Sequence, residues 1–221
     1  MVLELDNVEL YFKRKRILGS TYLRAEKGKV TGILGRNGSG KSCILNIIFG
    51  SLSPKYKLLR INGTHILKAL FLSKTVAFLP QHDFIPNRKK IISIFNLFKV
   101  NWVEFAKAFP EFYKFKDKHF NQLSGGERRF IEIYLILKKH CDIVLLDEPF
   151  NGISPLMIEH VKTLINEEKQ NKIIIITDHR YNDVIDVSDN LYLIFNGTSK
   201  SIKNLEELET YNYLSMGTLN Q

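Results

Sequence analysis

Residues Ile33–Gly50, ILGRNGSGKSCILNIIFG, place a glycine-rich loop between two apolar runs. The loop matches the pattern G-x-x-x-x-G-K-[ST] through Gly35, Gly40, Lys41 and Ser42. The preceding run VTGILG is expected to be a strand. The following run has helical spacing and ends at Gly50, a residue typical of a helix C-terminus. Because glycines lose much conformational freedom on folding, we expect this loop to bind something that compensates the loss.

A phosphate is the ligand that this loop suits best. Glycines let successive backbone N–H groups turn inward around an anion, and the helix N-terminus adds a partial positive charge. Lys41 is expected to reach the terminal phosphates, and the Ser42 hydroxyl to ligate Mg²⁺. An incidental glycine turn is the alternative, which the strand-loop-helix context disfavours. GTPases, kinases and ATPases share the pattern, so it indicates a nucleotide-binding protein and nothing narrower.

The composition is that of an ordinary soluble globular protein with one substantial core: 221 residues, 44% hydrophobic and 25% charged. No apolar run approaches the roughly 20 residues that span a bilayer, and the N-terminus lacks the layout of a secretory signal. We therefore expect a cytoplasmic protein with its two cysteines, Cys43 and Cys141, reduced and buried. The formal charge of +9 suits nucleic acid, an anionic membrane surface or a polyanionic ligand, without choosing between them.

Strand-like and helical segments alternate along the chain. Strands are expected at residues 3–12, 30–35, 56–63, 74–81, 142–149, 172–179 and 190–197. Helices are expected at residues 41–50, 92–109, near 156–168 and, as a short tail, within 204–214, with another beginning in residues 122–140. This alternation indicates an α/β domain. The stretch from Ile91 to Phe120 looks like a helical lobe inserted between strands.

An acidic pair ends the apolar run IVLLDEP. A strand that is buried on both faces holds its last side chains rigidly at the carboxyl edge of a sheet, where ligands gather in α/β proteins. Asp147 is expected to hold Mg²⁺. Glu148, one residue on, can orient and deprotonate an attacking water, which favours hydrolysis over kinase chemistry. A strand end capped by solvated acids is the alternative.

A second small anion-binding turn appears in LSGGE, Leu123–Glu127, just before a long apolar-patterned stretch. A serine and two glycines at a helix start present backbone N–H groups to an anion. One nucleotide needs only one such cradle. A second cradle makes sense if it contacts phosphate held by another copy of the chain, so we expect two copies to face each other.

Together the segments GRNGSGKS, LPQ, QLSGGE, LLDEP and TDH resemble the nucleotide-binding subunit of an ABC transporter, over nearly the whole chain. The resemblance implies an α/β fold with a P-loop NTPase, RecA-like core and an antiparallel β subdomain (residues 1–83 and 136–221). It implies a helical subdomain, inserted at about 84–135, that carries the turn Leu123–Glu127, which we call the signature turn. All of these parts lie within a single domain, 1–221. It also implies that the chain binds ATP and Mg²⁺ and hydrolyses the ATP in an ATP-dependent head-to-tail homodimer.

The resemblance also assigns residues by matching position. Catalysis is expected from Glu148, His179, Lys41 and Gln81. Magnesium is expected at Ser42, Gln81 and Asp147. Nucleotide contacts are expected from Tyr11, Gly35, Asn37, Gly38, Ser39, Gly40, Lys41, Ser42 and Cys43, and across the dimer from Ser124, Gly125 and Gly126. Tyr11 would stack on adenine, although its neighbour Phe12 could exchange roles with it. One departure is Ser154, which stands where the family usually has an interface aspartate.

The implied partner is a separate transmembrane permease subunit, with the chain held peripherally on the inner face of the cell membrane. The aromatic and basic stretch 82–115 would form the groove that receives a helix of this partner, with most of its aromatics packed into the lobe itself. No direct nucleic-acid contact is expected. A soluble ABC ATPase in protein or iron-sulfur assembly, or in work on nucleic acid, is the alternative. A catalytically silent scaffold is disfavoured because the motif residues are all present. The permease would select the transported substrate.

Overall fold

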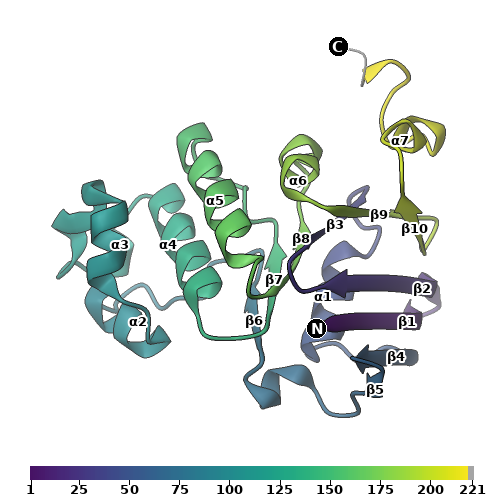
Figure 1. Cartoon of the computed structure of the whole chain (residues 1–221), viewed down its shortest axis with the longest axis horizontal. Helices are drawn as coiled ribbons and strands as arrows, with labels where there is room; N and C mark the ends of the chain where they lie inside the picture. Colours follow the sequence, from purple (N-terminus) through teal and green to yellow (C-terminus); the bar gives the residue numbers. More distant parts are fainter. Residues whose placement is uncertain (219–221) are drawn as a thin grey trace.

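The computed structural model describes residues 1–218, and its larger sheet forms the centre of the fold (Figure 1). The strand order is β10-β9-β3-β8-β7-β6. Five strands run parallel, and β10 pairs antiparallel with β9. The strands are β3 (Val30–Gly35), β6 (Val76–Leu79), β7 (Ile143–Asp147), β8 (Ile173–Thr177), β9 (Asn190–Phe195) and β10 (Thr198–Ile202). Every residue of β3, β7 and β8 is buried, which explains their unbroken apolar runs.

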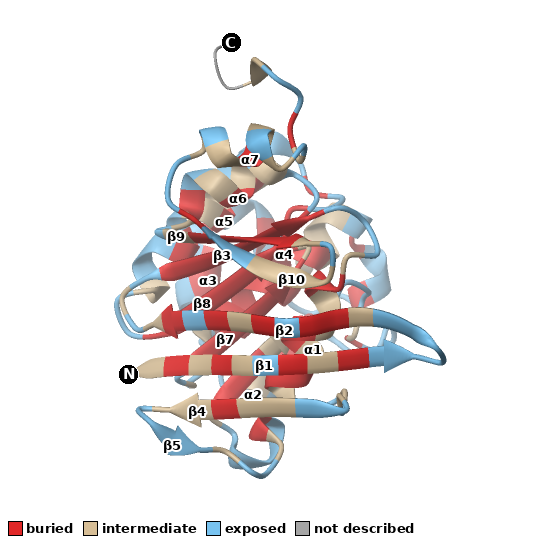
Figure 2. Ribbon diagram, turned by 90° about the vertical axis from the view of Figure 1, so that its right-hand side faces the viewer, coloured by how far each residue is buried: buried red, intermediate tan, exposed pale blue. Residues whose placement is uncertain are grey.

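A smaller antiparallel sheet has the order β2-β1-β4-β5. Its strands are β1 (Val2–Phe12), β2 (Lys15–Glu26), β4 (Tyr56–Ile61) and β5 (Thr64–His65). Buried and more exposed residues alternate along β1, as Figure 2 shows by colour, because one face of this sheet packs on the core. Helix α1 (Lys41–Phe49) contributes four buried apolar residues to a core shared by both sheets. The expected α/β class is confirmed.

The remaining helices cover the larger sheet and extend beyond it. They are α2 (Ile91–Phe98), α3 (Trp102–Ala108), α4 (Gly125–Lys138), α5 (Pro155–Glu168), α6 (Tyr181–Val187) and α7 (Glu206–Thr210), with short 3₁₀ turns η1 (Leu70–Ser73), η2 (Pro110–Phe115) and η3 (Phe120–Gln122). Figure 1 shows α2 and α3 at the end of the molecule farthest from the antiparallel sheet. Phe105 lies at the centre of their packing, in ring contact with Phe95, Trp102, Phe109, Phe112, Phe130 and Tyr134.

The observed secondary structure differs from the expected one in several places, and α6 and the short β5 are among the elements that were not predicted. Strand β2 was not predicted; its pattern is interrupted by Gly19 and by Ser20, which has a φ of +53°. Strand β10 was also missed, since its only fully buried residue is Ile202. The expected helix over residues 92–109 is two helices, because Lys99 adopts a φ of +57° and the Asn101 side chain accepts the Val103 N–H to begin α3.

No helix within residues 1–218 combines the length and the apolar character that crossing a membrane requires. The expected boundaries of the helical subdomain, near residues 84 and 135, stay a prediction.

We expect Phe105→Ala to lower the free energy of unfolding by about 3–5 kcal/mol, because truncation of a fully buried ring leaves a cavity among its aromatic neighbours. Chemical denaturation followed by circular dichroism measures this change. Tyr113→Ala is the matched control, since that ring is 68% exposed, and its effect should stay within about 0.5 kcal/mol. Equal losses of unfolding free energy in the two variants would contradict a central packing role for Phe105.

Candidate functional site

A hollow of about 620 Å³ lies where β3, β7 and β8 end. We call it the phosphate hollow, and it is lined by Phe12, Ile17, Asn37, Gly38, Gly40, Lys41, Ser42, Cys43, Gln81, Glu148 and His179. The parallel strands explain this convergence, because their carboxyl ends meet at one edge of the sheet. Residues far apart in the sequence therefore come together here, as the motif spacing predicted.

The glycine-rich loop follows β3 directly and ends at α1. Gly40 caps α1 with a φ of +106°, and a Cβ built there would lie 2.8 Å from the Leu18 side chain. Only glycine fits such a position without strain. The Lys41 ammonium is buried and donates to the Gly35 carbonyl at 2.7 Å. Burial lowers the pKa of Lys41, and Glu148 and Asp147 raise it in part.

Asp147 is the buried anchor of the site. Its Oδ1 accepts hydrogen bonds from the Ser42 hydroxyl at 3.0 Å and from the Thr177 hydroxyl at 2.7 Å. These two bonds join the first turn of α1 and the end of β8 to the end of β7. Burial raises the pKa of this carboxyl, which the two hydroxyls partly offset. A carboxylate and a hydroxyl side by side are oxygen donors of the kind that Mg²⁺ prefers, with waters completing its shell.

Glu148 lies over the same edge in a strained backbone conformation, with a φ of +49°. Its carboxylate Oε2 accepts a hydrogen bond from the Gln81 amide at 2.9 Å, and Nδ1 of His179 lies 3.6 Å from the same oxygen. The Glu148 N–H donates to the Thr177 carbonyl at 2.8 Å. The structure thus gathers the three side chains Glu148, Gln81 and His179 within one contact network at the hollow.

The aromatic neighbour of the hollow is Phe12. This ring lines the hollow and is 49% exposed. Tyr11 is 39% exposed but is not among the lining residues, and the Lys55 ammonium lies 5.5 Å from its ring centre. Alternation along β1 turns adjacent side chains to opposite faces, so the sequence could not decide between the two.

The signature turn lies elsewhere on the surface. Ser124 and Gly125 are exposed, and neither they nor Gly126 line the phosphate hollow. Ser124 caps α4: its hydroxyl accepts the Glu127 N–H, and the Glu127 carboxylate accepts the Ser124 N–H at 2.7 Å. The turn is therefore a preformed, open helix start that lies outside the phosphate hollow of its own chain.

Ser154, the residue that departs from the family pattern, caps α5 by accepting the Met157 N–H at 3.4 Å. Serine and aspartate both serve well at this position of a helix. Serine at this position thus keeps the helix cap and removes the negative charge that an aspartate would carry.

Sequence reasoning missed one residue that holds the site together. Arg129 is buried and donates to the backbone carbonyls of Pro80, Asp147 and Glu148 at 2.8, 2.9 and 3.1 Å. Its ion-pair partner Glu132 lies 3.4 Å away. The available signal was an arginine and a glutamate one helical turn apart on a face that is otherwise apolar, where charges are rare unless paired.

Glu132 connects the same helix to the segment after Gln81. Its Oε1 accepts the N–H groups of Phe84 and Ile85, at 3.0 and 3.3 Å. Burial raises the pKa of Glu132, and these N–H groups and Arg129 oppose the shift. Helix α4, which begins at the signature, is thereby tied to both sides of the hollow.

Comparison with known proteins gives a consistent result. The family model described as ABC transporter matches residues 18–151. The chain is 28% identical over 212 residues to a probable ABC transporter ATP-binding protein of Cyanophora paradoxa, covering 87% of this chain and 84% of that one. It is 26% identical over 231 residues to the lipopolysaccharide export system ATP-binding protein of Haemophilus influenzae, covering 94% and 95%.

Solved structures show the same fold. The chain superposes with a TM-score of 0.82 on an ATP-binding subunit of an ABC transporter, at 19% identity, covering 100% of this chain and 97% of that one. A nucleotide-free ATP-binding cassette from an ABC transporter gives a TM-score of 0.76 at 24% identity, covering 97% and 96%. These similarities confirm the RecA-like P-loop fold expected from the sequence.

We expect Arg129→Met to lower the free energy of unfolding by about 3–5 kcal/mol, because it leaves Glu132 buried without its ion-pair partner. Urea denaturation measures the change. The adjacent Arg128 is the control: it is partly exposed and pairs with Asp83 at 3.4 Å, so Arg128→Met should cost at most about 1 kcal/mol. A smaller loss for Arg129→Met than for Arg128→Met would contradict the anchoring role.

Proposed function

The chain belongs to the ABC transporter family, whose ATP-binding domains are ATPases, and from this premise we propose how it works. Two copies close head to tail on ATP, and hydrolysis drives substrate movement through separate transmembrane subunits. The observation that carries the proposal is the separation of the two anion-binding elements. The phosphate loop faces the hollow, whereas the signature turn is exposed and outside it.

ATP binds with its phosphates in the loop and its base toward the β1–β2 hairpin. Backbone N–H groups of residues 35–43 surround the phosphates, and Lys41 turns from the Gly35 carbonyl to the phosphate oxygens. Phe12 takes the stacking role expected of Tyr11, because it is the aromatic that lines the hollow. Ile17 completes the apolar end.

The Mg²⁺ site is formed by Ser42 and Asp147, whose oxygens already lie 3.0 Å apart, with Gln81 at the rim of the hollow. The donor set fits a hard cation that keeps several waters. Bound Mg²⁺ supplies charge neutralisation for the phosphates. Asp147 must be ionised to hold it, so the raised pKa of this buried carboxyl makes metal binding weaken on acidification earlier than at an exposed aspartate.

Glu148 is the general base that orients and deprotonates the attacking water. Gln81 holds the Glu148 carboxylate at 2.9 Å, and His179 stands beside it toward the terminal phosphate. A positioned base of this kind contributes about 10²–10⁴-fold to a rate. The backbone bonds from Arg129 and to Thr177 fix the strained Glu148 conformation, so the carboxylate is held in place before ATP arrives.

The partner copy supplies the missing half of each site. Ser124, Gly125 and Gly126 of one copy contact the phosphates bound by the other, using backbone N–H groups at the start of α4. Gly126 packs closely on the segment before α5, since a Cβ there would lie 3.0 Å from the Gly152 carbonyl. Ser154 lies at the end of that segment. Its neutral hydroxyl places no negative charge at this part of the interface, next to the second ATP, where the family usually has an aspartate.

A transmembrane subunit docks in the groove beside Gln81. This docking groove has a volume of about 310 Å³ and is lined by Phe84, Ile85, Pro86, Lys89, Ser93, Ile94, Leu97 and Phe98. Leu97 is 76% exposed, whereas Trp102 and Phe105 are buried in the lobe, so few of the aromatics in residues 82–115 are open to a partner. The groove joins the ATP site through Glu132, which binds the N–H groups of Phe84 and Ile85. Docking there places the chain peripherally on the inner face of the membrane.

A role in protein or iron-sulfur assembly, or on nucleic acid, is not favoured by the relatives, several of which are named as ABC transporter ATP-binding proteins. Among the relatives, one is named for lipopolysaccharide export and another for branched-chain amino acid transport.

We expect Glu148→Gln to bind ATP but accumulate as a dimer, because removal of the base stops hydrolysis and with it reopening. Multi-angle light scattering with ATP and Mg²⁺ measures the mass. Lys41→Ala is the control and should remain monomeric, since it loses a charge-assisted phosphate contact. A monomer in both variants would rule out closure on ATP.

Leu97→Asp should release the chain from membranes that contain its permease, because a carboxylate in an apolar groove is desolvated without a partner. Sedimentation of native membranes followed by immunoblotting measures the bound fraction. Val103→Asp, on the neighbouring helix at a position 71% exposed and outside the groove, is the control and should sediment as before. Recovery of the unmodified chain in a wholly soluble complex would support the assembly alternative.

A further inference from the structure

Four consecutive cations, Lys13–Arg16, form the tip of the hairpin between β1 and β2, and we call them the basic tip. All four residues are exposed, and Figure 2 shows the tip at the edge of the molecule. The turn is tight, since Phe12 pairs with Lys15 across it. Lys13 has a φ of +55°, a conformation that favours glycine or asparagine in a hairpin turn. Neither the backbone of the tip nor its mutual charge repulsion therefore favours the hairpin.

The chain does not neutralise the basic tip. The nearest carboxylates along the chain, Glu9 and Glu26, have other partners: Glu9 pairs with Lys55, and Glu26 with Arg24 and Lys29. Within the described residues 1–218, no ion pair involves the side chains of the tip. Their charge is thus available to an anion from outside the chain.

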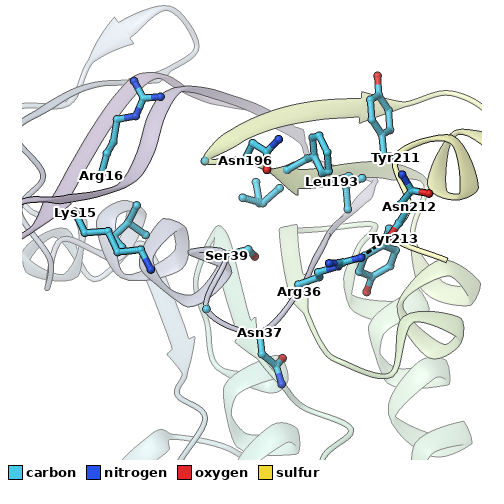
Figure 3. Close-up of a pocket in the computed structure, with 15 residues that line it drawn as sticks. Lys15, Arg16, Arg36, Asn37, Ser39, Leu193, Asn196, Tyr211, Asn212 and Tyr213 are labelled. Atoms are coloured by element: carbon cyan, nitrogen blue, oxygen red, sulfur yellow. Dashed lines mark hydrogen bonds between the residues drawn. The ribbon is translucent and has the colours of Figure 1, made fainter. Parts of the chain in front are cut away.

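The basic tip borders the phosphate loop on two sides. Phe12 and Ile17, which flank the tip, line the phosphate hollow. Lys15 and Arg16 line a second cavity, of about 570 Å³, which we call the rear cavity (Figure 3). Residues 37–38 of the loop line both spaces. The tip is therefore next to the site where the phosphates of ATP are proposed to bind.

The rear cavity is cationic throughout. Arg36 of the phosphate loop is its third cation, and no aspartate or glutamate is among its 15 lining residues. The Nη2 of Arg36 donates to the Asn212 carbonyl at 2.8 Å. A carbonyl is neutral, so this hydrogen bond leaves the positive charge of Arg36 uncompensated. The space behind the phosphate loop thus adds to the positive potential of the tip.

The phosphate hollow itself has the opposite balance. Lys41 faces two carboxylates there, Glu148 at the lining and Asp147 beside Ser42. The proposed hydrolysis needs both carboxylates, yet they repel an approaching nucleotide, because Mg²⁺–ATP retains a net negative charge. Attraction at a distance must therefore come from the rim of the hollow.

The sequence concentrates its positive charge in the segments that form this rim. Residues 10–82 contain fourteen lysines and arginines, and Glu26 is their only acidic residue. This stretch includes the basic tip and the phosphate loop. Clefts with one sign of charge at their edge raise the association rate of oppositely charged ligands.

We propose that the basic tip steers ATP into the phosphate hollow, so that it sets the association rate of the nucleotide without contacting it in the bound state. The inference rests on the proposed binding of ATP in the hollow. Neighbouring Cα atoms are about 3.8 Å apart, so each Cα of the tip lies within about 8 Å of one that lines the hollow. This is inside the Debye length of about 10 Å at 0.1 M salt.

A nucleotide fits the position of the tip better than a membrane surface does. Phe12 and Ile17 turn into the hollow from either end of the tip, and Lys15 and Arg16 line the cavity behind the phosphate loop. The charges are thus gathered around the loop. A membrane surface would be served by cations that point away from the site.

The test uses stopped-flow fluorescence with Mg²⁺ and mant-ATP, a fluorescent ATP. The tip variant carries Lys13→Gln, Arg14→Gln, Lys15→Gln and Arg16→Gln. At about 0.02 M salt its association rate constant should fall about tenfold, the lower end of what electrostatic steering contributes, while the dissociation rate constant changes less than about twofold. At about 0.5 M salt screening should reduce the difference in association to less than about twofold.

A lobe variant with the same change in net charge is the matched control. It carries Lys107→Gln, Lys114→Gln, Lys116→Gln and Lys118→Gln, at four exposed lysines. They lie in and after α3, at the end of the molecule farthest from the antiparallel sheet (Figure 1). Because the charges removed are distant from the hollow, its association rate constant should stay within about twofold of the unmodified chain.

Three results would overturn the proposal: equal association rate constants in the tip and lobe variants, a loss that persists at high salt, or a change confined to dissociation. Loss of binding to phosphatidylserine vesicles by the tip variant, with unchanged association of mant-ATP, would also overturn it and assign the tip to a membrane. Thermal melts show whether both variants fold. Failure of the proposed function is distinguishable, because the unmodified chain would then bind no mant-ATP, or Lys41→Ala would bind it equally well.

Discussion

The buried carboxylate of Asp147 is the constraint on which the site depends. It accepts the Ser42 and Thr177 hydroxyls through one oxygen and so joins the loop–helix junction to the ends of two neighbouring strands. A charge in this position is stable only with such partners. Because β7 and β8 are buried over their whole length, the carboxylate has almost no freedom to move. The loop, the acidic pair and the threonine strand end are therefore fixed relative to one another by the core itself.

A second buried charge extends this rigidity to the helical part of the chain. Arg129 binds the backbone at Asp147 and Glu148 from α4, and Glu132 of the same helix binds the backbone after Gln81. The signature turn at the start of α4 and the proposed docking groove after Gln81 are thus connected to Glu148, the proposed general base, through hydrogen bonds to backbone. A hydrogen bond to the backbone fixes the position of a whole chain segment, whereas a contact between two side chains can adjust by a change of rotamer.

The local motifs could be predicted because each one needs particular residues at fixed spacing. The turn that approaches α1 requires glycine at position 40, the lysine follows at the helix start, and the acidic pair ends a strand that is apolar throughout. Strands β2 and β10 were missed because their sequences mix charges, glycine and short polar runs. They are strands because neighbouring segments pair with them, which no local pattern records.

The sequence by itself determined the α/β class, the phosphate loop, the acidic strand end and the family, because these depend on covalent spacing and on runs of apolar residues. Only the tertiary structure decided that Phe12 rather than Tyr11 lines the hollow, and that Arg129 anchors the backbone at Glu148. It alone decided that the chain's own signature turn stands apart from its phosphate loop. Each of these depends on the direction in which a side chain points once distant segments have packed. That direction follows from the whole core, to which every segment contributes.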